Sequence, residues 1–455
     1  MPEHTAAAAT HTSAPSTLDL LGESDVDRTF WRPGTPYAPP VDESVDIMRG
    51  GPVVQTAERA SAPTVATPRA PTARVLGAFV LVAAVLAAVV TAADGGRQNP
   101  DPTLRAPSWL DGWYQYDAGW YRHIVESGYS YTPGQQSSIA FFPVYPMGVR
   151  ALRAVVDDTQ TAGTLLALLA GAGAVLLFAR WAWTRLPRRS AVAAVGVLLL
   201  YPYAMFLYGA MYADSLFLLC AIGSFVLLER RWYLAAGLVG ALATAGRPVG
   251  VAVVVGLVVR TIELIAQDRA AGDGPVGPRD LVQAVRGVRP RHLGVLASVL
   301  GIAGWCVYLW LAFGNPVAFV AVESAPGWDQ GAGPRTWLKI AYAGTLVKGP
   351  RDIAILLTIQ AVVCLCAVLL LRRVWQRFGW GYLAYAAVVL AIPILGTKDF
   401  MGTGRYALVA FPALAAAGDF LATRRRRWVL VAVLCASAAL LLVLTWLFGR
   451  SVEVS

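Results

Sequence analysis

Apolar runs of up to about twenty residues recur along this chain, and they restrict its fold more than any other sequence feature. A helix needs roughly 20 apolar residues to cross the hydrocarbon core of a bilayer. We therefore predict an all-α, polytopic membrane protein with about eleven transmembrane helices. The predicted spans lie near residues 75–93, 159–179, 191–206, 215–228, 232–245, 249–259, 293–313, 352–371, 382–395, 406–421 and 428–448.

Composition supports this class. Hydrophobic residues make up 56% of the 455 positions and charged residues 15%, which is too apolar for a soluble enzyme of this length. Residues 1–73 differ, because they are rich in Ala, Pro, Thr and Ser and have no apolar period. We predict a disordered cytoplasmic tail over 1–73, a transmembrane domain over 74–455, and interfacial helices in a large first loop, residues 94–158.

The net charge of +10 comes mainly from arginines between the apolar runs. If the N-terminus is cytoplasmic, every arginine cluster falls on the cytoplasmic side, as the positive-inside rule requires. These clusters lie at 180–189, 230–231, 260–291, 372–377 and 424–427. This rule explains the basic charge better than nucleic-acid binding, so we expect no nucleic acid partner. Lysine is scarce beside abundant Ala, Arg and Val, as is typical of a high-GC bacterial source. We therefore predict a bacterial plasma-membrane protein whose loops 94–158, 207–213, 314–351 and 396–405 face outward.

The segment from Trp113 to Arg150 reads WYQYDAGWYRHIVESGYSYTPGQQSSIAFFPVYPMGVR and is dense in aromatic residues. On a helix, one face would carry Trp113, Asp117, Trp120, Tyr121 and Ile124. Trp and Tyr favour the membrane–water boundary, so we predict an interfacial helix that presents Asp117 to a water-filled site. The alternative is that Asp117 only caps a helix beginning near Trp120.

Three further charged residues fall within or between apolar runs. An ionised side chain near the bilayer centre costs about 2.5–3.5 kcal/mol on insertion scales, so it is usually paired or functional. Asp214 opens a predicted span, and a helix N-cap is its alternative role. Arg405 could instead snorkel to the interface. Arg247 lies between Gly246 and Pro248, where a helix break leaves backbone groups in need of partners.

The sequence offers no dedicated cofactor site. The five cysteines lie in apolar runs, which argues against disulfides and thiolate metal sites. His123 has no second histidine nearby, and an ordinary interfacial role remains open for it. No glycine-rich run follows a predicted strand, which is the context that a phosphate-binding loop requires. We therefore expect a reaction that uses neither a metal nor a cofactor.

The run YDAGWYRHIVESGYSY followed by QSSIAFFPVYP resembles the first outer loop of the PIG-V mannosyltransferase family, within the GT-C superfamily of membrane glycosyltransferases. Further matches follow in the family's order at 212–217, 247–250, 314–319 and 404–406. The chain departs from the family pattern at Tyr116 and Val125, and neither change touches the carboxylate of Asp117. The tail before residue 75 lies outside the resemblance.

The resemblance implies a GT-C-like fold and an inverting hexosyltransferase. A sugar, usually mannose, would pass from a polyprenyl-phosphate donor to a lipid, glycan or protein acceptor on the extracytoplasmic face. Asp117 is the expected general base, and Arg247, Arg405 and Lys398 are the expected ligands of the donor phosphate. The expected substrate-pocket residues are Tyr121, Arg122, His123, Tyr129, Phe142, Tyr145, Tyr212, Asp214, Asn315, Trp328 and Tyr406.

Two other classes remain open. A secondary transporter would place charges and broken helices at the membrane midplane, often in paired repeats. No internal repeat is evident here, and the charged candidates gather in the outer loops. A non-catalytic lipid-binding membrane protein is the third class. Asp117→Asn separates the enzyme from such a non-catalytic protein, because it removes the base and keeps the shape.

Overall fold

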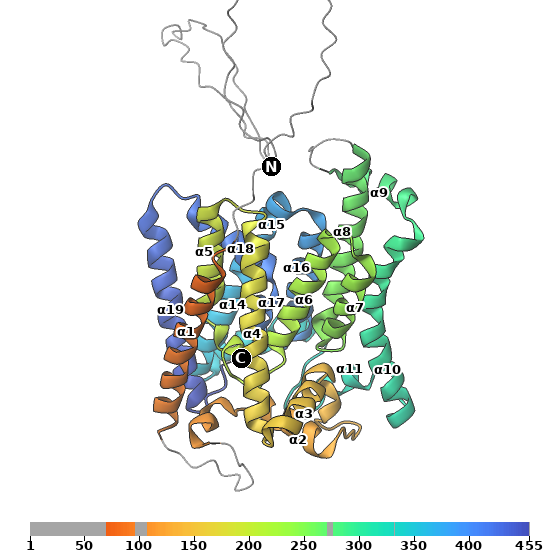
Figure 1. Ribbon diagram of the computed structural model, residues 1–455. Helices are drawn as coiled ribbons and strands as arrows, with labels where there is room; N and C mark the ends of the chain where they lie inside the picture. The colour runs from red at the N-terminus through yellow and green to blue at the C-terminus, as the bar shows by residue number, and fades with distance from the viewer. Residues whose placement is uncertain (1–69, 96–106, 271–275, 332, 455) are drawn as a thin grey trace, which may run out of the picture. The chain divides into compact units, whose positions relative to one another are not determined.

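The computed structural model describes residues 70–95, 107–270, 276–331 and 333–454, and every regular element within these ranges is a helix (Figure 1). The predicted tail lies outside the described residues, apart from 70–73. The α-helices are α1 (Thr72–Asp94), α2 (Asp117–Ser127), α3 (Val144–Val156), α4 (Thr159–Trp183), α5 (Arg188–Leu199), α6 (Asp214–Glu229), α7 (Tyr233–Thr244), α8 (Val251–Ala270), α9 (Pro278–Ala284), α10 (Val299–Phe313), α11 (Ala318–Glu323), α12 (Pro334–Trp337), α13 (Ile340–Lys348), α14 (Arg351–Leu369), α15 (Leu371–Phe378), α16 (Trp380–Gly396), α17 (Thr403–Val409), α18 (Phe411–Ala422) and α19 (Arg427–Gly449). The 3₁₀ helices are η1 (Ser108–Trp113), η2 (Ser138–Ala140), η3 (Ala204–Leu207), η4 (Pro248–Gly250), η5 (Val285–Gly287) and η6 (Pro290–Ser298).

By length and composition, six helices of the described chain can cross a membrane. A seventh span exists if α17 and α18, which are bent by 81° at their junction, are counted as one. The six are α1, α4, η4 with α8, η6 with α10, α14 with α15, and α19. The described residues therefore have the helices of a multi-pass membrane protein, but the predicted count of about eleven is not confirmed.

Each predicted span does overlap a helix, and the difference in count is a matter of helix length. The helices α5 and α7 have 12 residues each, α6 has 16 and α16 has 17. A 12-residue helix is only about 18 Å long, which is too short for a bilayer core of roughly 30 Å. Residues 200–213 are apolar and buried but mostly irregular, so apolar composition there does not mean a continuous helix.

The first connector folds back on the helices through two short elements. Helix α2 begins at Asp117 and not at Trp113, which belongs to η1, so the predicted single helical face is broken between them. Pro143 precedes α3, and Pro146 lies in its first turn, where proline is tolerated. Both prolines of the FFPVYP segment thus lie at the start of α3, and neither interrupts the interior of a helix.

Small residues let the helices approach closely. A Cβ atom on Gly237 of α7 would overlap the Gly294 carbonyl oxygen of η6, and a Cβ on Gly381 of α16 would overlap Arg260 of α8. Close backbone contact of this kind is how membrane helices gain packing energy where lipid replaces water. The glycines thus fix the short helices against their longer neighbours.

One buried set of ion pairs joins helices at their arginine-rich ends. We call Arg185, Glu229, Arg260 and Glu263 the Glu229 network. Arg185 Nη2 and Arg260 Nε lie 2.9 and 2.8 Å from Glu229 Oε1. Arg260 Nη1 also lies 2.9 Å from Glu263 Oε2. Two of the predicted cytoplasmic arginine clusters, 180–189 and 260–291, therefore meet. Helices α9 and α15 lie at the end of the helices opposite α2, α3 and α11 (Figure 1). Which end faces the cytoplasm stays a prediction.

Candidate active site

The turn before α2 places Asp117. Tyr116 has a positive φ of 51°, which is uncommon for a residue with a side chain. The Tyr212 hydroxyl accepts a hydrogen bond from the Asp117 backbone N–H at 3.3 Å and donates one to the Gln115 carbonyl at 3.2 Å. A single hydroxyl from outside the loop thus supports the turn on both sides.

The Asp117 carboxylate pairs with an arginine from a distant part of the sequence. Arg405 Nη1, in α17, lies 2.8 Å from Asp117 Oδ2, across 288 positions of sequence. The Arg405 guanidinium carbon lies 5.0 Å from the centre of the Tyr212 ring and 5.5 Å from that of Phe206. Because both rings present their faces to a cation, they hold the guanidinium in place beside Asp117.

A second pair lies deeper and connects to the first. Arg247 Nη1 forms a buried ion pair with Asp214 Oδ1, and Arg405 Nε lies 3.9 Å from Asp214 Oδ2. We call these four residues the Asp117 network. Their side chains become less accessible inward, from 29% exposed for Asp117 to 2% for Asp214. A buried charge is tolerated only when it is paired, and in this arrangement each carboxylate lies beside a guanidinium.

These contacts bear on the simpler alternatives for the same residues. Helices α2 and α6 begin at Asp117 and Asp214, so the N-cap residues are the preceding Tyr116 and Ala213 and not the two aspartates. Neither N-cap side chain makes a capping hydrogen bond. The Arg405 side chain is 14% exposed and paired with Asp117, so it does not extend into solvent as a snorkelling arginine does.

An aromatic wall extends from the network. The Tyr121 ring centre lies 6.4 Å from that of Tyr212 and 5.2 Å from that of Phe141. Trp328 reaches the same wall from the predicted outer loop 314–351, with its ring 6.1 Å from Phe141. On the other side, Arg247 Cζ lies 4.7 Å from the centre of the Tyr406 ring. The structure therefore groups Tyr121, Tyr212, Tyr406 and Trp328 around the charged residues.

Other predicted pocket residues make contacts outside this group. Tyr129 packs on Trp305, and so does Phe142, at ring distances of 4.8 and 5.7 Å. The Tyr145 hydroxyl donates a buried hydrogen bond to the Gly163 carbonyl at 2.8 Å. Tyr129 and Phe142 therefore lie away from the charged residues. The Tyr145 ring also packs edge to face on Tyr121, with centres 4.9 Å apart, so Tyr145 supports the aromatic wall from behind.

The remaining polar predictions are also satisfied locally. Arg122 pairs with Glu126, one turn along α2, at 3.1 Å. Asn315 Oδ1 accepts the Val317 backbone N–H at 3.0 Å. His123 is exposed and hydrogen-bonds to no described residue. The structure brings none of these three side chains into the Asp117 network.

Lys398 takes an intermediate position. Its ammonium lies 3.1 Å from Asp329 Oδ2, and both side chains are partly exposed, at 32% and 56%. The pair joins the predicted outer loops 396–405 and 314–351, next to Trp328. Lys398 therefore lies near the aromatic wall and outside the buried pairs.

Two aromatic residues of the site have no signal in the sequence. Phe448 of α19 packs its ring 6.3 Å from Tyr116, 6.2 Å from Tyr212 and 5.9 Å from Phe206. Phe206 in turn lies under the Arg405 guanidinium. Both phenylalanines belong to apolar runs, where a membrane-facing residue and a site residue look alike.

Burial and the charge of Asp117 raise the pKa of two further carboxyl groups. Burial and the nearby Asp117 raise the pKa of Glu323 to about 7, against an opposing effect of Arg405. Burial and Asp117 also raise the pKa of Glu453 above its usual value. Glu323 belongs to α11 and Glu453 follows α19, so two more segments approach the network.

The site has no arrangement of ligands for a dedicated metal. Within the described ranges, no group of three or more His, Cys, Asp or Glu side chains is placed to hold an ion. The network could bind an anion through its guanidiniums, and its carboxylates could accept protons. That the reaction needs no metal stays a prediction.

Comparisons with known proteins leave the family open. No protein-family model matches the sequence, and no curated protein sequence matches it. Among solved structures, the chain is similar to ArnT from Cupriavidus metallidurans bound to undecaprenyl phosphate, at 15% identity over 83% of this chain and 77% of that chain, with a TM-score of 0.44. It is also similar to the Archaeoglobus fulgidus oligosaccharyltransferase, at 12% identity over 82% of this chain and 56% of that chain, with a TM-score of 0.41. Likenesses this distant carry no inference about activity, so the site is interpreted from its own geometry.

Proposed function

We propose that this protein is a membrane glycosyltransferase that moves a hexose, in the first instance mannose, from a polyprenyl phosphate to an acceptor hydroxyl on the extracytoplasmic face. One observation carries the proposal: a partly exposed carboxylate, Asp117, is held 2.8 Å from a mostly buried arginine, Arg405. Sugar transfer from a lipid phosphate needs a proton acceptor for the hydroxyl and a cation for the departing phosphate.

Both groups retain unused capacity. Asp117 Oδ2 accepts from Arg405, whereas Oδ1 accepts no hydrogen bond from the described residues. Arg405 Nε is buried and has no hydrogen-bond partner in the described part of the chain. An unsatisfied buried donor is costly, so such an atom marks a place where a ligand oxygen fits.

The proposed step uses these groups directly. The acceptor oxygen attacks the anomeric carbon from the face opposite the phosphate and forms the new carbon–oxygen bond. The bond from carbon to phosphate oxygen breaks, and its electron pair leaves with the polyprenyl phosphate. Asp117 takes the proton of the acceptor hydroxyl, and Arg405 stabilises the departing phosphate. Attack from the opposite face inverts the anomeric centre.

We assign different roles to Arg247 and Lys398, the other two expected phosphate ligands. Arg247 is buried, paired with Asp214, and stacked on Tyr406. We assign it to positioning Asp214 beneath Arg405, so that it contributes positive potential to the phosphate site. Lys398, which is partly exposed, is suited to meet the donor phosphate on entry. Arginine suits the position of Arg405 because a guanidinium can bind two phosphate oxygens at once.

A secondary transporter is the second candidate, favoured by the 81° bend between α17 and α18. Broken helices that carry charges are typical of transporter binding sites. A transporter would move its substrate across the membrane without forming a new glycosidic bond. Product analysis therefore separates the two functions.

The test is transfer of label from radiolabelled polyprenyl-phosphate mannose to membrane acceptors by the purified protein in liposomes. Asp117→Asn should abolish the labelled product and keep donor binding. The matched control is Asp352→Asn, an exposed aspartate at the start of α14. EDTA should leave the rate unchanged. Equal product from the wild type and Asp117→Asn, or activity that EDTA abolishes and magnesium restores, would contradict this mechanism.

A further inference from the structure

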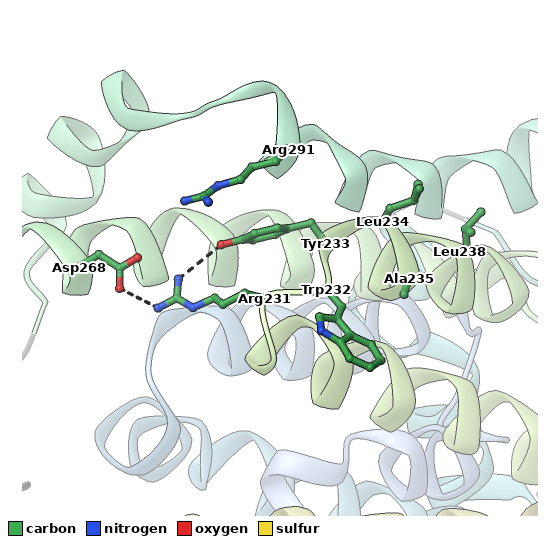
Figure 2. A pocket seen from close by; sticks show the side chains of 8 residues that line it. All are labelled: Arg231, Trp232, Tyr233, Leu234, Ala235, Leu238, Asp268 and Arg291. Atoms are coloured by element: carbon green, nitrogen blue, oxygen red, sulfur yellow. Dashed lines mark hydrogen bonds and ion pairs between the residues drawn. The ribbon is translucent and has the colours of Figure 1, made fainter.

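A groove lies at the start of α7, near the arginine-rich ends of the helices, and the proposed reaction does not use it (Figure 2). Its volume is about 740 Å³, within the range of small-molecule sites. It is bounded by the turn before α7, the first turns of α7, the end of α8 and the beginning of η6. The lining residues are Arg231, Trp232, Tyr233, Leu234, Ala235, Leu238, Asp268 and Arg291.

One end of the groove is cationic. Arg231 Nη2 lies 2.7 Å from Asp268 Oδ1, and Arg231 Nη1 lies 3.5 Å from the Tyr233 hydroxyl. The guanidinium of Arg291 lies on the same side of the groove (Figure 2). Arg291 Nε donates to His292 Nε2 at 3.2 Å, and its Nη groups donate to no described side chain. Two guanidiniums therefore face one carboxylate, and a positive charge remains.

Close packing fixes the distance between the two arginines. Gly237 of α7 and Gly294 of η6 approach so closely that neither position can hold a larger residue. The Tyr233 and His292 rings meet edge to face, with centres 4.8 Å apart. Because both contacts join α7 to η6, Arg231 and Arg291 are held on facing walls.

The other end of the groove is apolar and continues along α7. Leu234, Leu238 and Leu242 recur at intervals of four, so they share one helix face. They are 59%, 50% and 49% exposed, and no other described element covers them. Trp232, which is 58% exposed, lies beside the arginines at the start of this stripe. Tryptophan at the boundary between a charged rim and an apolar stripe is typical of the membrane interface.

We propose that this groove binds one anionic phospholipid from the leaflet on the arginine-rich side. Its phosphodiester would lie between Arg231 and Arg291, and one acyl chain would follow the leucine stripe. Basic pockets between transmembrane helices bind anionic head groups in this way. Asp268 leaves a net positive charge of one on the three groups, which matches a singly charged phosphodiester. The proposal is independent of the reaction assigned to Asp117.

The experiment is native mass spectrometry of the delipidated full-length protein, titrated with phosphatidylglycerol in detergent. We expect one tightly bound lipid. Arg291→Gln should weaken its binding by roughly tenfold, as expected for loss of one charged hydrogen-bonding partner. Arg286→Gln is the matched control, because Arg286 is exposed, lies nearby in sequence and does not line the groove. Equal affinities for the two variants would overturn the proposal.

Two further measurements test the lipid itself. Leu238→Ser should also weaken phosphatidylglycerol binding, and this variant tests the site even if Arg291→Gln fails to fold. Phosphatidylcholine, which carries no net charge, should bind more weakly, and glycerol phosphate, which lacks acyl chains, should not displace the lipid. Unchanged binding by Leu238→Ser, equal retention of phosphatidylcholine, or displacement by glycerol phosphate would each contradict an anionic lipid site.

Discussion

The Asp117 and Glu229 networks contain the same kinds of groups, two carboxylates and two arginines, but they differ in how completely those groups are bonded. Glu229 accepts from Arg185, from Arg260 and from the Tyr382 hydroxyl, the last at 3.0 Å. Glu263 accepts the backbone N–H groups of Trp380 and Gly381 at 3.0 and 3.1 Å, in addition to Arg260.

The Asp117 network is less complete. Asp117 has one oxygen without a hydrogen bond from the described residues, and Arg405 Nε is buried without a partner. The Glu229 network also has one such donor, Arg185 Nε, but both of its carboxylates are fully engaged. Saturated carboxylates stabilise a junction of helices, whereas an unsaturated carboxylate beside an unsatisfied guanidinium can still bind a ligand. The same ion-pair chemistry thus serves structure at one end of the molecule and, in our proposal, catalysis at the other.

The largest effect should come from removing the free carboxylate. Asp117→Ala should lower turnover by about 10²–10⁴-fold, the usual contribution of a positioned proton acceptor. Its loss of stability should be smaller than that of Glu229→Ala, because Arg405 keeps Asp214 as a second carboxylate at 3.9 Å. Initial rates and a thermal unfolding curve on the same preparation measure the two effects separately. If the variant keeps near-normal turnover, Asp117 is not the base.

In the Glu229 network we expect a loss of stability and no loss of turnover. Glu229→Ala leaves Arg185 and Arg260 without their shared partner and should destabilise the fold by about 3–5 kcal/mol. Folded protein that remains should keep its turnover. The control is Asp268→Ala, which breaks an exposed pair worth about 0–1 kcal/mol. A denaturant titration that shows equal stability for both variants would refute the structural role.

Substitutions of Arg405 test whether its unpaired Nε–H group binds the phosphate of the polyprenyl-phosphate sugar. A cation that holds phosphate acts before and during the reaction, so Arg405→Ala should raise KM and lower kcat together. Arg405→Lys should recover part of the loss, because a point charge remains and the two-pronged guanidinium does not. A donor titration on each variant measures both constants. A change in kcat alone would show that Arg405 positions Asp117 and does not bind the donor phosphate.

The smallest effect concerns pH. The pKa of Glu323 is raised to about 7, so the folded state keeps a proton that the unfolded state has already lost. The free energy of unfolding should therefore fall as the pH rises from about 4.5 to 7, and then level off. Glu323→Gln should flatten this part of the profile. Melting temperatures of both proteins between pH 5 and 8 check it, and parallel profiles would show that Glu323 is not the group responsible.

The sequence predicts the class of fold and much of the charged site. Asp117, Asp214, Arg247 and Arg405 stand out because ionised groups are expensive in or beside apolar runs, and the structure joins all four. The number of membrane-spanning helices could not be predicted as well, because hydropathy reflects composition and does not show whether a helix is continuous. Residues 200–213 are apolar, yet they are mostly irregular, with Gly209 at a φ of 151° against the Trp113 ring. The partners Phe206 and Phe448 could not be predicted, because their role depends on which helices meet.

The contact between Tyr116 and Phe448 has a consequence for biosynthesis. The unusual backbone at Tyr116 is packed against a ring of the last helix, and Asp117 is paired with Arg405, 288 positions further along the chain. At about 5–20 residues per second, roughly 15–65 s separate synthesis of Asp117 from that of Phe448. Until Arg405 is made, Asp117 lacks its ion-pair partner, and until Phe448 is made, Tyr116 lacks the ring that it packs against. The site is thus assembled only when the final helix inserts, so a truncated nascent chain lacks the geometry for transfer.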